Sequence, residues 1–183
     1  KTDLKIIQSD FPDFIGKKTE FYIKEKFPDI SKGLLDKILA ERKELQFKNI
    51  RKNKLLPGTI ELLKYLKSEK YKIAIATGSK EVFVKKILIL YGILECFDVI
   101  ITGENFKTSK SNPECYRKAL KQIRLKPSEV IIIEDSPAGI LAGKKVNAKV
   151  FAIQTYLDKT KLQRADKIFK NNHKDFIGNY KKR

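Results

Sequence analysis

From residue 55 onward, short apolar runs alternate with segments that carry apolar residues at helical spacing. The apolar runs are YKIAIAT at 71–77, FDVIIT at 97–102, VIIIE at 130–134, AKVFAI at 148–153 and, more weakly, DKIF at 166–169. They are continuously apolar rather than alternating, which favours strands whose two faces are both covered. The pattern therefore predicts an α/β fold with a Rossmann-like parallel sheet.

The segments between these runs predict the helices that cross from one strand to the next. We expect helices from Leu-Pro-Gly at 56–58 through Ser68, at 80–90, at 113–123, at 137–146, and a last one at 173–180. Helices of about this length suit βαβ units with both faces of the sheet covered.

Residues 1–54 have a different texture, polar and helical, with no strand pattern. Two segments, FYIKEKF and SKGLLDKILAERKEL, place apolar residues three and four positions apart, and Ser31 suits the N-cap of the second. We therefore expect two domains. One is an α-helical unit over 1–54, incomplete on its N-terminal side, and the other is an α/β core over 55–183.

The charge balance is strongly basic. Forty Lys and Arg against 22 Asp and Glu give a net charge of +18, and 34 of the basic residues are Lys while 6 are Arg. Specific recognition of phosphates and base edges favours the Arg fork, whereas these lysines are spread along the whole chain. Two interpretations stay open, a compositional habit and a functional basic surface. We do not expect nucleic acid as a partner.

Several classes of protein are disfavoured by the residue types present. Cys96 and Cys115 are too few for a disulfide framework or a zinc site, which indicates a reducing compartment. No apolar run reaches the roughly 18 residues of a membrane span and no signal peptide is visible, so we expect a cytoplasmic monomer without membrane contact. The sequence has no Walker-type phosphate loop and no GxGxxG loop, and the single histidine, His173, leaves no Ser-His-Asp arrangement.

Polar residues gather where the predicted strands end. Ligands of open parallel sheets bind at the carboxyl ends of the strands, which share one edge. The residues at that edge are Thr77, Gly78 and Ser79 after the first strand, Gly103, Glu104 and the later Lys110 after the second, and Glu134 and Asp135 after the third. A hydroxyl, an ammonium and two carboxylates at one edge suit a phosphoryl group together with a divalent cation.

Each of these groups has a chemical use and an ordinary structural alternative. The Thr77 hydroxyl and the backbone N–H groups after it can hold anionic oxygens, or can simply cap the following helix. Lys110 lies just before a predicted helix start and can balance phosphate charge, or can be one solvated lysine among many. Glu134 and Asp135 follow four branched apolar residues and can hold Mg²⁺, or can charge a helix N-terminus.

Three segments in order, IAIATGSK, SKSNPECY and VIIIEDSPAGILAG, resemble the second, third and fourth motifs of the haloacid dehalogenase superfamily. They match its branch with a helical cap, which includes β-phosphoglucomutase, phosphoglycolate phosphatase and pseudouridine-monophosphate phosphatase. The resemblance implies that Thr77 and Gly78 bind the transferred phosphoryl group and that Lys110 neutralises it. It also implies that Asp135 binds Mg²⁺ with Glu134 beside it. Thr77 and Lys110 would be the catalytic residues of this chain.

The segment PDFIGKKT at 12–19 resembles the part of the cap that selects the substrate. Gly16, Lys17 and Lys18 match the Gly-Lys-Lys of the pseudouridine phosphatase-like group, so the resemblance implies that they contact the substrate. Thr19 stands where the mutase has an arginine that grips a substrate phosphate, which weakens the mutase interpretation.

The first motif of the family, Asp-x-Asp-Gly-Thr/Val on the first strand, does not occur in residues 1–183. In the family its first Asp is the nucleophile. We therefore expect the nucleophile, and a central strand between those ending at Thr77 and Glu134, to lie outside these residues, and the chain alone to be inactive.

The function that the resemblance implies is a Mg²⁺-dependent phosphatase. It would act on a small phosphorylated metabolite, such as a sugar or nucleoside phosphate, through an aspartyl-phosphate. Two alternatives stay open: a β-phosphoglucomutase-like sugar-phosphate mutase, and a non-catalytic basic binding protein.

Overall fold

Parallel strands in two separate ladders form the centre of the molecule. The computed structural model describes residues 16, 18–108 and 112–170, and the structural statements below refer to these residues. The strands are β1 (Ala74–Ala76), β2 (Val99–Ile101), β3 (Ile131–Glu134), β4 (Lys149–Gln154) and β5 (Lys167–Lys170). One ladder has the order β1–β2 and the other β3–β4–β5, with every pairing parallel. These ladders confirm the predicted α/β class.

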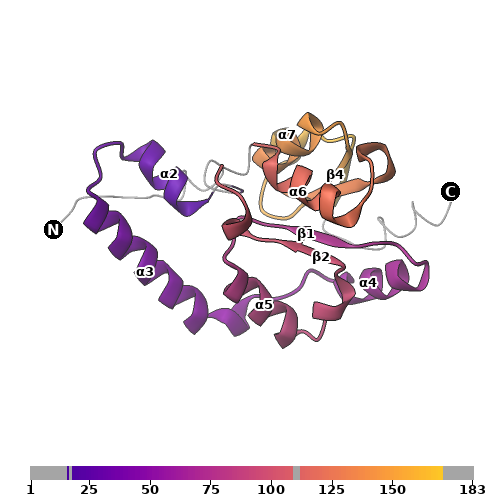
Figure 1. Ribbon diagram of the computed structural model, residues 1–183, viewed down its shortest axis with the longest axis horizontal. Helices are drawn as coiled ribbons and strands as arrows, with labels where there is room; N and C mark the ends of the chain where they lie inside the picture. The colour runs from indigo at the N-terminus through magenta and orange to yellow at the C-terminus, as the bar shows by residue number, and fades with distance from the viewer. Residues whose placement is uncertain (1–15, 17, 109–111, 171–183) are drawn as a thin grey trace.

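Helices connect the strands and lie on both sides of the ladders (Figure 1). They are α4 (Thr59–Ser68), α5 (Glu81–Leu90), α6 (Glu114–Ile123) and α7 (Pro137–Lys145). Short 3₁₀ turns lie at Ile50–Lys52, Leu94–Cys96, Gly103–Asn105, Pro127–Glu129 and Lys159–Leu162. The four helices fall where the sequence pattern predicts them, whereas the helix expected at 173–180 lies outside the described residues.

Local hydrogen bonds fix where two of these helices begin. Ser136 Oγ accepts from the Gly139 N–H at 3.1 Å at the start of α7. Asn112 Oδ1 accepts from the Glu114 N–H at 3.0 Å, and α6 begins one residue after Pro113, which the sequence pattern places in the first helical position. Both starts lie directly after the loops that carry the candidate site.

An apolar cluster joins the two ladders through α6 and α7. Its fully buried members are Ile101 of β2, Cys115 of α6 and Ala142 of α7. A second cluster surrounds Val150 of β4, and a third surrounds Leu88 of α5 next to β1. Burying one branched side chain contributes about 1.5–3 kcal/mol, so these clusters hold the ladders together although no strand among the described residues joins them.

An apolar cavity of about 290 Å³ separates β1 from β3. Residues of β1, α6 and β3 line it, among them Ala74, Ala119 and Ile133. Neither strand has a ladder partner on this side within the described residues, and Ile133 of the edge strand β3 is 41% exposed. As predicted, β1 and β3 do not hydrogen-bond to each other. Two unpaired strand edges therefore border an apolar space.

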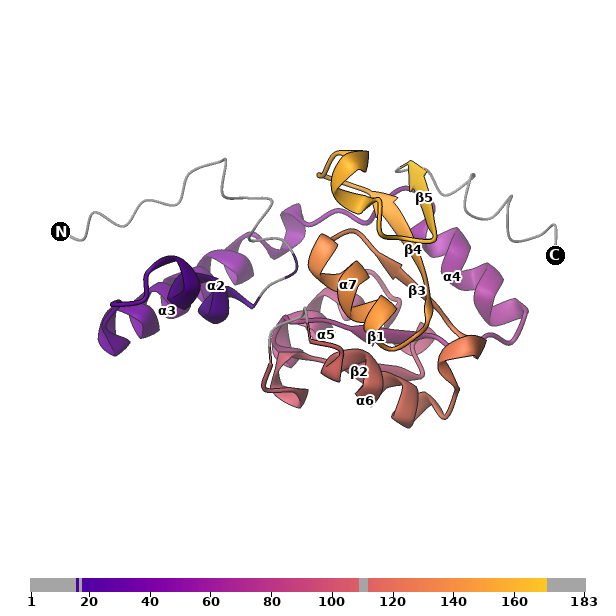
Figure 2. The ribbon, with the colours of Figure 1, turned by 90° about the horizontal axis from the view of Figure 1, so that it is seen from above.

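A helical hairpin lies to one side of the ladders (Figures 1 and 2): α2 (Thr19–Lys26) and α3 (Lys32–Lys48). Ser31 Oγ accepts from the Leu34 N–H at 3.3 Å, which confirms the predicted N-cap. Ile23 and Leu35 are buried where the two helices pack. The division into a helical domain and a core domain stays a prediction. None of the helices in the described part of the chain is long and apolar enough to cross a bilayer.

Candidate functional site

The turns after β1 and β2 touch each other at the carboxyl edge. The Thr77 N–H donates to Ile101 O at 2.9 Å, and Thr77 Oγ1 accepts from the Ser79 N–H at 3.2 Å. The Gly103 N–H donates to Ser79 O at 2.8 Å, and a Cβ at Gly103 would lie 2.4 Å from Gly78 O. Glycine at 103 therefore permits this close approach, which fixes the Thr77 hydroxyl at the end of β1.

The Glu104 carboxylate caps α5 from the turn after β2. Its Oε2 accepts from the Glu81 N–H at 3.0 Å and from Thr102 Oγ1 at 3.0 Å. Partial burial acts to raise the pKa of Glu104, but the hydrogen bonds from Glu81 and Thr102 outweigh it, and the pKa is lowered. The carboxylate is thus used in fixing the turn that lies against Thr77 and Gly78.

The two adjacent acids after β3 have different surroundings. Glu134 is 6% exposed, and its carboxylate accepts from the Tyr116 hydroxyl and, at 3.0 Å, from Ser136 Oγ. Burial, and then the neighbouring Glu134, raise the pKa of the Tyr116 hydroxyl and keep it protonated. Asp135 is half-buried, and its Oδ2 accepts from Thr155 Oγ1 at 3.1 Å. The Glu134 carboxylate is buried and bonded to protein hydroxyls. Asp135 is more exposed and is therefore the acid better placed to bind a ligand.

Gly139 of α7 leaves the space that the Glu134 carboxylate occupies. A Cβ there would lie 2.1 Å from Glu134 Cδ and 2.2 Å from Glu134 Oε2. We expect Gly139→Ala to lower the free energy of unfolding by about 1–3 kcal/mol, because the carboxylate must move away from its donors. Urea unfolding followed by circular dichroism measures the loss.

Gly33→Ala on α3 is the matched control, since a methyl group at this position would have no heavy atom within 4 Å. This change should leave stability unchanged or raise it by up to about 1 kcal/mol, because Ala favours the helix. Equal effects of the two substitutions would show that the contact with Glu134 does not matter.

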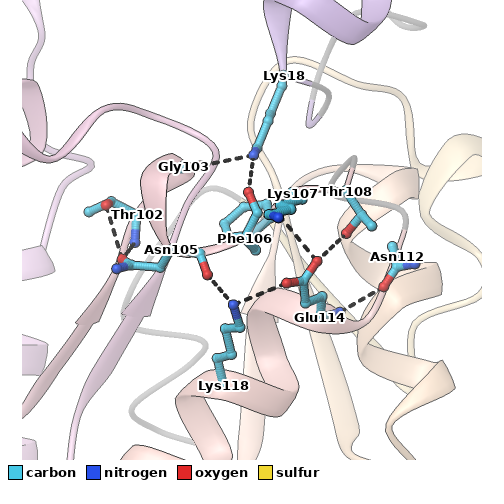
Figure 3. A network of polar contacts seen from close by, with 10 residues as sticks. All are labelled: Lys18, Thr102, Gly103, Asn105, Phe106, Lys107, Thr108, Asn112, Glu114 and Lys118. Carbon is cyan, nitrogen blue, oxygen red and sulfur yellow. Dashed lines mark hydrogen bonds and ion pairs between the residues drawn. The ribbon is translucent and has the colours of Figure 1, made fainter.

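A polar network holds the loop between β2 and α6 (Figure 3). The Glu114 carboxylate accepts from three donors, the Lys107 N–H at 3.3 Å, Thr108 Oγ1 at 2.9 Å and Lys118 Nζ at 3.0 Å. Hydrogen bonds from Lys118 and Thr108 lower the pKa of Glu114 to about 2. The loop is thus anchored just before Lys110. Lys110 itself lies outside the described residues, and its role stays a prediction.

The lowered pKa of Glu114 predicts a loss of stability in acid. Its folded pKa, about 2, lies below the ordinary value of 4.5, so the stabilisation is present above that value and is lost as the pH falls toward 2. We expect the wild-type melting temperature to fall more between pH 4.5 and pH 2 than that of Glu114→Gln. Glu44→Gln, at an exposed position of α3, should follow the wild type. Parallel curves for Glu114→Gln and the wild type would contradict the assignment.

Gly16 touches the turn after β3. A Cβ at Gly16 would lie 2.4 Å from Ser136 Oγ, and the backbone there has φ of 82°, in the left-handed region. Both the contact and the conformation favour glycine. Lys17, which was also predicted to contact the substrate, lies outside the described residues.

The Lys18 side chain extends from the start of the helical hairpin to the turn after β2 (Figure 3). A Cβ at Gly78 would lie 3.4 Å from Lys18 Cγ, so the aliphatic part of Lys18 passes over the turn after β1. Lys18 Nζ donates to Gly103 O at 2.8 Å and to Phe106 O, and it lies 4.1 Å from the centre of the Phe106 ring. The predicted residues Gly16, Lys18 and Gly78 thus lie together at the strand ends.

Sequence reasoning missed the side chains that hold the two acids. Tyr116 and Ser136 donate to Glu134, and Thr155 donates to Asp135. Ser136 carries a sequence signal, since it precedes Pro137 at a helix start, but that signal indicates a cap rather than a donor to Glu134.

A magnesium site in the described residues would have one carboxylate as its main protein ligand. No three His, Cys, Asp or Glu side chains of that part of the chain come together as a metal cluster. Mg²⁺ binds hard oxygen atoms and often takes one or two carboxylates, with waters and phosphate oxygens as the rest. The half-buried Asp135 carboxylate is a donor of that type. The buried Glu134 carboxylate next to it would support Asp135 rather than bind the metal itself.

The family model of the haloacid dehalogenase-like hydrolases matches residues 2–153. The chain belongs to this family. Membership confirms the resemblance drawn from the three motifs. Among solved structures, a hydrolase from Pseudomonas syringae has a TM-score of 0.85 at 20% identity, over 97% of this chain and 84% of that one. This likeness confirms the predicted fold.

Two relatives of this haloacid dehalogenase-like chain are phosphatases. A validoxylamine A 7'-phosphate phosphatase from Streptomyces hygroscopicus is 32% identical over 114 residues, 62% of this chain and 54% of that protein. A phosphorylated carbohydrates phosphatase from Thermotoga maritima is 32% identical over 108 residues, 59% of this chain and 49% of that protein. The matched region spans about half the length of both relatives.

Proposed function

We propose that the protein to which this chain belongs is a Mg²⁺-dependent phosphatase of small phosphorylated metabolites, with sugar phosphates as the favoured class. The observation that carries the proposal is that the turns after β1, β2 and β3 all lie against Gly16 or Lys18. Family membership supports the hydrolase activity, and the Thermotoga maritima phosphatase of phosphorylated carbohydrates supports the substrate class.

The turn after β1 suits the phosphoryl group. The Thr77 hydroxyl accepts from the Ser79 N–H and retains its own proton, which it can donate to a phosphoryl oxygen. The Gly78 N–H lies beside it at the end of the strand. The Lys110 ammonium would balance the negative charge of the phosphoryl group as the ester bond breaks.

The turn after β3 suits the cation. Asp135 would hold Mg²⁺ through its carboxylate. Glu134, itself held by Tyr116 and Ser136, would keep the backbone of Asp135 in place by accepting from its N–H. A bound Mg²⁺ would supply positive charge next to the phosphoryl oxygens and so favour attack at phosphorus.

We place the nucleophile in a segment outside residues 1–183, because no Asp-x-Asp occurs within them. A carboxylate oxygen would bond to phosphorus as the alcohol leaves, and water would then hydrolyse the acyl phosphate to inorganic phosphate. The cavity between β1 and β3 supports this view, since its unpaired strand edges can accept an added strand.

The test is a screen of the complete natural gene product against a panel of phosphomonoesters, with release of inorganic phosphate measured in Mg²⁺ and in EDTA. We expect hydrolysis of sugar phosphates that EDTA abolishes. Isomerisation that requires a sugar bisphosphate would favour the mutase instead. No turnover, together with oligonucleotide binding that survives physiological salt, would favour the basic binding protein.

A further inference from the structure

The Lys18 side chain connects the helical hairpin to the turn after β2. It is the residue directly before α2, and its ammonium donates to the carbonyl oxygens of Gly103 and Phe106, 85 and 88 residues away. Both acceptors lie in the turn after β2. One side chain therefore connects two parts of the fold that are far apart in the sequence.

The Lys18 ammonium lies in a partly buried environment next to an aromatic ring. Lys18 is half-buried, its ammonium lies over the ring of Phe106, and Phe106 is 3% exposed. Burial lowers the pKa of Lys18, while the nearby carboxylate of Glu114 opposes the change. Two carbonyl oxygens and an aromatic face replace much of the water that an exposed ammonium would have.

These contacts fix the residues that begin the hairpin. With its ammonium on the turn after β2 and its stem over Gly78, Lys18 holds the chain across the strand ends. Gly16, two residues earlier, lies against Ser136, next to Asp135. The ammonium is therefore occupied by backbone acceptors, whereas the sequence prediction assigned Lys18 to direct contact with substrate.

We propose that Lys18 is a positioning residue: its bonds to Gly103 and Phe106 hold Lys18 and the nearby Gly16 over the turns that carry Thr77 and Asp135. The role of Lys18 in catalysis rests on the proposed function, whereas its contact with Gly103 and Phe106 does not. Holding Gly16 and Lys18 in place aligns a substrate with the strand ends, and misplacement by about 1 Å can cost a hundredfold in rate.

The test compares Lys18→Met, Lys18→Arg and Lys24→Met in the complete gene product. Methionine keeps the apolar stem but has no donor, and arginine can donate to two carbonyls. Lys24 is the control because it lies on α2, in an exposed ion pair with Glu20. Hydrogen exchange of peptides covering 99–108 measures whether Lys18 stabilises the turn after β2. Phosphatase kinetics measure whether that contact affects catalysis.

We expect Lys18→Met to speed exchange in 99–108 by roughly tenfold, with wild-type exchange in Lys24→Met and partial recovery in Lys18→Arg. In the phosphatase assay, kcat should fall at least about tenfold in Lys18→Met, with KM within about threefold. Unchanged exchange in Lys18→Met overturns the inference, even if no phosphatase activity is found. Faster exchange with a wild-type kcat reduces Lys18 to a structural contact and also overturns it.

Discussion

Replacing Asp135 by Asn should lower the phosphatase activity of the complete gene product by at least about a hundredfold, with the fold retained. Asparagine has the same shape and can still accept from Thr155, so the loss would follow from the missing negative charge. A carboxylate binds Mg²⁺ far better than a neutral amide, and the activity should need a higher Mg²⁺ concentration. The measurement is kcat/KM across a Mg²⁺ series.

Asp158→Asn is the matched control for this change. Asp158 caps a 3₁₀ turn by accepting from the Thr160 N–H at 2.9 Å, a contact that Asn can also make. Its kcat/KM should equal that of the wild type. If Asp135→Asn retains wild-type activity at low Mg²⁺ concentration, Asp135 is not the metal ligand and the proposed site is wrong.

Replacing Glu134 by Ala should lower the free energy of unfolding by about 3–5 kcal/mol, the largest stability effect that we expect. The substitution leaves the Tyr116 and Ser136 hydroxyls buried without their common acceptor. Glu134→Gln retains one acceptor oxygen and should lose less. Urea unfolding measures both variants, and Glu44→Ala on exposed α3 should stay within about 0.5 kcal/mol of the wild type.

A double-mutant cycle separates the hydrogen bond from general packing. Tyr116→Phe removes the phenolic donor and nothing else, so it should be destabilising in the wild type and nearly neutral beside Glu134→Ala. Additive effects of the two substitutions would show that Tyr116 and Glu134 are not coupled. The hydrogen bond from Tyr116 would then not support the role proposed for Glu134, which is to keep Asp135 in place.

The order of helices and strands was predictable from the sequence because each strand lies within a longer apolar run, and these runs are easy to recognise. YKIAIAT at 71–77 yields only β1, Ala74–Ala76, because pairing with β2 begins at Ala74 opposite Val99. The Ile73 N–H donates instead to the Asp98 side chain, at 2.7 Å from Oδ2. The opening between β1 and β3 was also predictable, but only through the family resemblance. Periodicity alone does not reveal which neighbouring strand is missing.

The site was predictable as a set of strand-end residues but not as a set of contacts. The sequence Glu134-Asp135 does not indicate that the first carboxylate is buried against Gly139 while the second is half-exposed. That difference depends on how closely α7 approaches β3. For the same reason, nothing in Gly-Lys-Lys at 16–18 indicates that the Lys18 ammonium meets the carbonyls of Gly103 and Phe106. Long-range packing decides both.

A crystal structure of the complete gene product with Mg²⁺ and orthovanadate tests the central claim most directly. We predict that the anion lies about 3 Å from Thr77 Oγ1, that Asp135 is a metal ligand, and that an added strand pairs with both β1 and β3. Anion and metal bound away from these turns, or direct hydrogen bonds between β1 and β3, would contradict the account.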